Sequence, residues 1–178
     1  MLEIYVEESE QYDEQNNEFI KIKPQVLKLE HSLVSISKWE SKWHKSFLST
    51  SDKTSEEILD YIRCMTINQV NPYTYYLLSQ KNINDILQYI DDPMTATTIK
   101  DIPGKKNSEV VTSELIYYWM VALEIPFECE KWHINRLLTL IKVCNIKNQP
   151  AKNMSRREVL NQNRLLNEAR RKKYHTKG

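Results

Sequence analysis

The longest apolar-rich segment of the chain, Thr112 to Ile146, predicts two helices joined at a proline. Four apolar side chains of its first half have the i, i+3, i+4, i+7 spacing of one helix face: Ile116, Trp119, Met120 and Leu123. Pro126 has no amide hydrogen and should end the first helix by Ile125. The same kind of spacing returns in the second half: His133, Leu137, Leu140 and Cys144. We therefore expect a second helix after the proline.

A different pattern, of period two, marks the N-terminal part of the chain. Residues 2–6 and 18–22 alternate apolar and polar positions and are rich in β-forming residues, which predicts the two strands of a small hairpin. The alternation at Leu27, Leu29 and His31 predicts a third short strand. Residues 96–101 and 109–112 indicate a second hairpin, with a mobile functional loop as the alternative.

Between these regions the chain carries helix start signals. The pattern changes to helical spacing from Ser32. Thr54 and Glu57 form a capping box, and Asn71–Pro72 is a cap followed by proline at the first helical position. A further helix should start near Asn82 and end before Pro93.

Two groups of aromatic residues are the candidate partner-binding sites. Trp39, Trp43 and Phe47 lie at i, i+4 and i+8, which places them in a stripe on one helix face. The favoured interpretation of this stripe is hydrophobic core, and the alternative is a docking face for a partner helix, because Trp and Tyr dominate binding hot spots. The second group is a cluster formed by Tyr117, Tyr118 and Trp132.

Together these patterns predict a mainly α fold with one or two small antiparallel β-hairpins and a basic C-terminal helix. We expect a mainly helical domain over residues 1–147, a linker over 148–155 and a basic helix or tail over 156–178. Ser155 and Glu158 form the capping box that begins the last helix at Arg156.

Composition narrows the class of protein. A chain of 178 residues corresponds to one domain with an appendage. No run of about 18 uncharged apolar residues is present, so we expect a soluble protein without a membrane span. Three cysteines without C-x-x-C spacing favour free thiols in a reducing compartment. Only 2 glycines exclude a Gly-rich phosphate loop.

The net charge of +1 hides an uneven distribution. Residues 156–178 contain 8 Lys/Arg and 2 Asp/Glu, whereas the rest contains 17 and 22. The basic residues of the predicted helix are Arg156, Arg157, Arg164, Arg170, Arg171, Lys172 and Lys173. This pattern is typical of an interaction arm and equally of a solvated helix end. Contact with nucleic-acid phosphates is a further alternative.

No group of residues predicts catalysis. Cys129 and His133 have a spacing that can chelate a metal, but zinc requires further ligands and Cys144 lies too far along the helix. The acidic pairs Asp91–Asp92 and Glu128/Glu130 do not differ from ordinary helix-end carboxylates. We therefore predict a non-enzymatic protein with no catalytic residues, no metal and no cofactor.

Three segments carry a resemblance to a known class of proteins. They are HSLVSISKWESKW at 31–43, IPFECEKWHINRLLTLIKVCNIKN at 125–148 and NRLLNEARRKKYHTKG at 163–178. In these segments the chain resembles small morphogenesis proteins of tailed bacteriophages, of the tail assembly chaperone type. Such proteins are small and mostly helical, and they are thought to coat the tape-measure protein until tail-tube subunits replace them.

The resemblance implies a phage tail assembly chaperone that binds apolar helical segments of the tape-measure protein or another tail protein. It would act in the host cytoplasm during infection, alone or as a homo-oligomer. One alternative is a minor structural tail or baseplate protein that stays in the virion. The other alternative is a nucleic-acid-binding regulator that uses the basic C-terminal helix.

Overall fold

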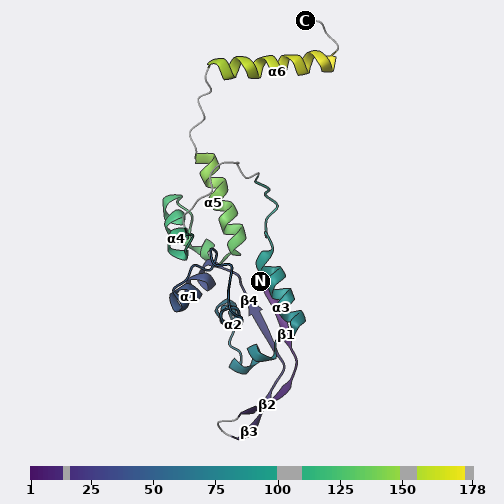
Figure 1. Ribbon diagram of the computed structural model, residues 1–178, viewed down its shortest axis with the longest axis vertical. Helices are drawn as coiled ribbons and strands as arrows, with labels where there is room; N and C mark the ends of the chain where they lie inside the picture. The colour runs from purple at the N-terminus through teal and green to yellow at the C-terminus, as the bar shows by residue number, and fades with distance from the viewer. Residues whose placement is uncertain (14–16, 100–109, 149–155, 175–178) are drawn as a thin grey trace. The chain divides into compact units, whose positions relative to one another are not determined.

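The computed structural model describes residues 1–13, 17–99, 110–148 and 156–174 (Figure 1). It is mainly helical, with two small antiparallel two-stranded sheets, which confirms the expected fold class. The chain divides into two compact units, Met1–Cys144 and Asn145–Gly178. Most of the expected linker, 149–155, lies outside the described residues. No helix in the described ranges is long and apolar enough to cross a membrane.

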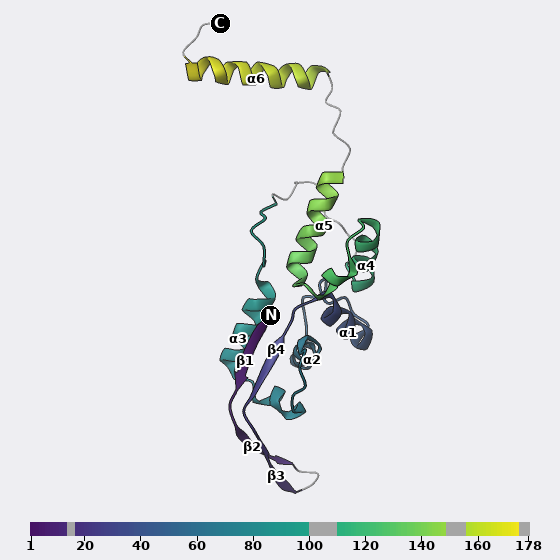
Figure 2. The ribbon, with the colours of Figure 1, turned by 180° about the vertical axis from the view of Figure 1, so that it is seen from behind.

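The N-terminal strands form one long hairpin. Strand β1 (Leu2–Val6) pairs with β4 (Gln25–Leu29), and β2 (Ser9–Asp13) pairs with β3 (Glu18–Ile22). The pairs Leu2↔Leu29 and Ser9↔Ile22 keep the same register, so the two sheets continue each other. Figures 1 and 2 show β2 and β3 extending beyond β1 and β4, away from the helices of this unit.

The predicted pairing of residues 2–6 with 18–22 is therefore wrong, although both strands exist. The polar residues 9–13 were expected in a link, but they form β2 and pair with 18–22. A strand in a projecting hairpin needs no buried face, so its sequence lacks the apolar alternation that would reveal it. Pro24 has no amide hydrogen to donate, and it lies at the interruption between β3 and β4.

Local capping chemistry places the helices of the middle region. Helix α1 (Leu33–Trp43) starts with a capping box between Ser32 and Ser35. Helix α2 (Ser55–Met65) starts at the predicted capping box of Thr54 and Glu57, and the 3-10 helix η1 (Pro72–Leu77) follows the Asn71 cap. Helix α3 (Gln80–Asp91) begins two residues before the expected Asn82, because the Ser79 side chain caps it.

The segment around Pro126 differs from the expected pair of helices. Helix α4 (Ser113–Ala122) ends before the proline, as predicted. The chain then forms a 3-10 helix, η2 (Phe127–Lys131), and only afterwards helix α5 (Ile134–Asn148). For the expected second hairpin, residues 96–99 and 110–112 contain no strand, and the part from 100 to 109 lies outside the described residues.

The hydrophobic core lies between the β1–β4 sheet and the helices of the first unit. Helix α1 packs against α2, α4 and η2, and α2 also lies against β4. The largest fully buried side chains come from β3, β4, α1, α2, α3 and α4 and are Ile22, Leu27, Leu29, Leu33, Ile36, Trp39, Tyr61, Ile62, Met65, Ile86, Ile116 and Met120. Aliphatic and aromatic burial of this extent is the main stabilising term of the unit.

The C-terminal unit contains helix α6 (Arg156–Tyr174), which starts at the predicted residue. Every side chain of α6 whose exposure is described is solvent-exposed within the protein. Leu160, Leu165 and Leu166 are among the exposed large apolar side chains.

Candidate functional site

The Trp39/Trp43/Phe47 stripe belongs to the core. Trp39 is fully buried and Phe47 is 8% exposed. Helix α1 ends at Trp43, so Phe47 reaches the core from the turn that follows the left-handed His44. There the Phe47 ring stacks on Tyr61 with centroids 3.8 Å apart. Trp39 and Phe47 thus belong to the hydrophobic core, as the favoured interpretation expected, and rings buried in this way offer no surface to a partner.

Trp43, the remaining member of the stripe, is half-buried and takes part in a polar network between α1 and α2. Its indole N–H donates to Asp60 Oδ2 at 2.9 Å, while the Trp39 indole N–H donates to the Glu57 carbonyl at 2.9 Å. Lys42 forms an ion pair with the other oxygen of Asp60. These contacts join the two helices.

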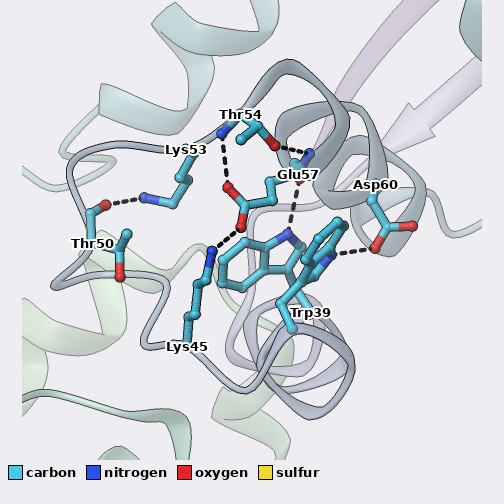
Figure 3. A network of polar contacts seen from close by, with 8 residues as sticks. Trp39, Lys45, Thr50, Lys53, Thr54, Glu57 and Asp60 are labelled. Carbon is cyan, nitrogen blue, oxygen red and sulfur yellow. Dashed lines mark hydrogen bonds and ion pairs between the residues drawn. The ribbon is translucent and has the colours of Figure 1, made fainter.

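Glu57 is the buried carboxylate of the same network. It accepts the Thr54 amide at 2.7 Å and the Lys45 ammonium at 2.6 Å (Figure 3). The hydrogen bond from Lys45 and the bond from Thr54 hold the pKa of Glu57 below its usual value. Both oxygens are occupied by the protein, so the geometry supports a structural role and not acid–base chemistry.

An exposed apolar surface lies on α4 and η2, and we call it the α4–η2 face. It is made by Tyr118, Val121 and Phe127, whose exposed fractions are 65%, 61% and 56%. Tyr118 and Val121 are one turn apart on α4, so their side chains are neighbours. Tyr117 connects the two elements, because its ring lies 6.4 Å from that of Phe127 and its hydroxyl donates to Glu130 at 2.9 Å.

The predicted cluster of Tyr117, Tyr118 and Trp132 is therefore only partly assembled. Tyr117 and Tyr118 belong to the α4–η2 face, whereas in the described residues no ring contact joins Trp132 to either tyrosine. Trp132 is half-buried under the Arg136 guanidinium, 4.1 Å from the ring centroid. Sequence reasoning missed Val121 and Phe127. The i, i+3 spacing from Tyr118 signals Val121, but nothing local signals that Phe127 folds back beside Tyr117.

Cys129 and His133 are not on one α-helix. Cys129 lies in η2, and His133 precedes α5 in a β-bridge with Ser32. Among the described residues, no three His, Cys, Asp or Glu side chains gather as a metal site. Burial raises the pKa of the Cys129 thiol, with Glu128 adding to the shift, which disfavours the nucleophilic thiolate.

One carboxylate of each acidic pair has a hydrogen-bond partner in the protein. Asp92 Oδ1 accepts the Met94 amide at 2.6 Å, and Glu130 accepts the Tyr117 hydroxyl. The two pairs lie on different elements, α3 with its C-cap and η2. Nothing in their contacts distinguishes them from carboxylates that stabilise chain turns.

Two histidines, one just before the N-terminus of α1 and one just before that of α5, lie next to each other. The rings of His31 and His133 lie 4.9 Å apart, and His31 Nδ1 is hydrogen-bonded to the buried Tyr61 hydroxyl. His133 Nε2 lies 2.9 Å from the Tyr89 carbonyl, which can only accept, so this nitrogen carries the hydrogen. Burial, together with His133, lowers the pKa of His31 to about 3.

The shifted pKa makes stability depend on pH. Below the ordinary value of 6.5 the unfolded chain binds a proton that native His31 does not bind, so stability falls as the pH decreases toward 3. Between pH 7.5 and 5 we expect a loss of about 2 kcal/mol in the free energy of unfolding. Urea denaturation at several pH values measures it. His31→Gln should remove this loss, whereas His44→Asn, at an exposed histidine, should keep it. If the free energy of unfolding depended equally on pH in all three proteins, His31 would not be its source.

The basic residues of the C-terminal unit gather on α6. Arg157, Arg164 and Arg171 are seven residues apart, which places them on one face at intervals of about 10.5 Å. Arg170, Lys172 and Lys173 extend the positive charge at the C-terminal end, and Arg156 begins the helix. Arg164 also pairs with Glu168 at 3.1 Å. The predicted basic helix thus exists.

Comparisons with protein-family models, curated proteins and solved structures give no match to this chain.

Proposed function

We propose that this protein is a non-enzymatic assembly factor that binds a helical segment of another protein through the α4–η2 face. The observation that carries the proposal is the exposure of Tyr118 and Val121, one turn apart on α4, together with exposed Phe127, whose ring lies next to that of Tyr117. Contiguous exposed apolar side chains mark interaction sites in folded proteins, and aromatic residues supply most binding hot spots. The Tyr117–Glu130 hydrogen bond holds α4 and η2 together, so the face is preorganised.

The sequence resemblance to tail assembly chaperones suggests the partner. A tape-measure protein is a long helix that exposes apolar stripes before the tail tube encloses it. Such a stripe presents side chains at i, i+3 and i+4, and it would cover the three apolar side chains of the α4–η2 face. Binding would keep the stripe from aggregating in the host cytoplasm until assembly.

Co-expression with the tape-measure protein tests this proposal. The unaltered chain should raise the soluble fraction of the partner, and the triple variant Tyr118→Ser, Val121→Ser and Phe127→Ser should lose most of that gain. A loss of about 1,000-fold in affinity is expected, because truncating a central interface aromatic costs about 2 kcal/mol and the variant removes two of them. The variant should remain folded, because the three side chains are exposed.

The matched control is the double variant Ile67→Ser and Tyr76→Ser, which removes equally exposed apolar side chains elsewhere in the same unit. It should keep the activity of the unaltered chain. Full retention of partner solubility by the α4–η2 triple variant would refute the proposed binding face.

A second candidate function is binding of the nucleic-acid backbone. It is favoured by Arg157, Arg164 and Arg171 on one face of α6 and by the basic residues at its C-terminal end. Affinity for duplex DNA should fall steeply as salt is added. Each neutralised phosphate makes the plot of log affinity against log salt concentration steeper by about 0.9. Replacing Arg170, Arg171, Lys172 and Lys173 by alanine should lower both affinity and slope, whereas Lys38→Ala on α1 should change neither. Absence of binding at low salt in a filter or anisotropy assay would eliminate this candidate.

A further inference from the structure

A pocket of about 440 Å³ lies beside the loop between α1 and α2, away from the α4–η2 face. It is half open, and its size falls in the range of small-molecule sites. Apolar walls come from α2, α3 and the turn after α1, and they are Phe47, Ile58, Leu87 and Ile90. His31 and Tyr61 are its buried polar residues, and Lys53 belongs to its rim.

His31 is 2% exposed, yet one of its ring nitrogens is not used by the protein. Nδ1 is bonded to the Tyr61 hydroxyl, whereas Nε2 has no protein partner among the described residues. In the same residues no fully enclosed side-chain nitrogen or oxygen lacks a hydrogen bond. Nε2 must therefore retain access to open space, and because His31 lines the pocket, we infer that Nε2 opens on it.

The neighbouring hydroxyls determine which nitrogen of His31 carries the hydrogen. Ser35 Oγ donates to the Ser32 carbonyl at 2.8 Å, so it has no hydrogen left for Tyr61, whose oxygen is 3.5 Å away. Burial raises the pKa of Tyr61 above its usual value, so it keeps its own hydrogen. The Tyr61 hydroxyl has two acceptors within reach, His31 Nδ1 and, at 3.5 Å, Ser35 Oγ. Because the contact with Nδ1 is much the shorter, we infer that Tyr61 donates to Nδ1, which leaves Nε2–H of His31 as a donor.

Lys53 adds a positive charge beside the same pocket. Its ammonium lies 4.5 Å from the centroid of Phe47 and donates to the Thr50 carbonyl (Figure 3). Within the described part of the chain Lys53 forms no ion pair with a carboxylate. The His31 ring is also close to Phe47, with centroids 6.1 Å apart, so both donors adjoin one wall.

We propose that this pocket binds a small carboxylate with an apolar body. The carboxylate oxygens accept hydrogen bonds from His31 Nε2–H and from the Lys53 ammonium, and the apolar body packs on Phe47, Leu87 and Ile90. Neutral His31 supplies a donor without a second buried charge, and Lys53 balances the anion. Asp91 also lines the pocket, and its exposed carboxylate repels an anion, so the charged end of the ligand is expected at Lys53 and not at Asp91.

The probe for this site is 3-phenylpropionate, and the uncharged control ligand is 3-phenylpropanol. Calorimetry on the full chain should show binding of the acid at least about tenfold tighter than of the alcohol. Nitrogen-15 NMR should show the Nε2–H form of His31 before addition and a shift of that nitrogen on addition. Finding the hydrogen on Nδ1 would overturn the donor assignment.

Two variants make the test independent of folding defects. Lys53→Met removes the positive charge but keeps a side chain of similar length. It should weaken binding of the acid about tenfold. Leu87→Trp, at a half-exposed position, should fill the pocket and abolish binding. Lys38→Met, a surface lysine on α1, should bind as the unaltered chain does. No binding at millimolar acid, or equal binding by Leu87→Trp, would overturn the proposal.

Discussion

Trp39→Ala is expected to lower the free energy of unfolding by about 3–5 kcal/mol. The ring is completely buried, stacks on Trp43 with centroids 6.2 Å apart and meets the Phe47 ring edge-on at 5.2 Å. Truncation leaves a cavity among these rings, and the Glu57 carbonyl loses its indole donor. Domains of this size are stable by only about 5–15 kcal/mol, so the variant should lose a large fraction of its total stability.

Trp43→Ala on the same helix is the matched control for this prediction. Trp43 is half-buried, and Asp60 keeps its ion pair with Lys42 when the indole is removed. Its cost should therefore be at least about 1–2 kcal/mol smaller than that of Trp39→Ala. Guanidinium denaturation monitored by circular dichroism measures both. Equal losses would mean that Trp39 does not occupy the centre of the core.

Glu40→Ala is the second substitution with a large expected effect, also about 3–5 kcal/mol. Glu40 is 8% exposed, and its two oxygens accept the Phe47 amide at 2.8 Å and the Ser113 amide at 2.7 Å. One carboxylate thus fastens the turn after α1 and the start of α4. Its removal leaves two buried amides without partners, each costing about 1–3 kcal/mol, and it creates a cavity.

Two further variants separate the charge of Glu40 from its shape. Glu40→Gln keeps the volume but can offer only one acceptor oxygen, so its loss should lie between those of the unaltered chain and Glu40→Ala. Glu56→Ala, at an exposed position in the first turn of α2, should change stability by less than about 1 kcal/mol. If Glu40→Ala were as mild as Glu56→Ala, the bridging role of Glu40 would be wrong.

Local signals in the sequence were sufficient to place several elements. The capping box of Thr54 and Glu57 gives the start of α2, the Asn71–Pro72 pair gives η1, and Arg156 begins α6 as expected. These signals work because the capping side chain and the amide it satisfies are at most a few residues apart.

Strand pairing and helix type at Pro126 depend on contacts that local patterns do not contain. Residues 2–6 could pair with either 18–22 or 25–29 on alternation alone, and the continuous register through the polar β2 selects the second. After Pro126, the β-bridge between Ser32 and His133 fixes the chain before α5, which shortens the helix that periodicity predicted.

The candidate sites were predictable to different degrees. Tyr117 and Tyr118 stand out as adjacent aromatics, but burial decides that Tyr118 is available and Trp39 is not. The pocket of His31 could not be predicted, because its residues come from positions between 31 and 135. Only the tertiary fold brings His31, Lys53 and Leu87 to one cavity.

Amide hydrogen exchange of the full chain, with and without an isolated apolar helix of the tape-measure protein, tests the central proposal most directly. We predict that protection on binding is concentrated in residues 113–131, which contain α4 and η2, and that the triple variant of the α4–η2 face loses it. No added protection in 113–131, or protection confined to α6, would contradict binding through this face.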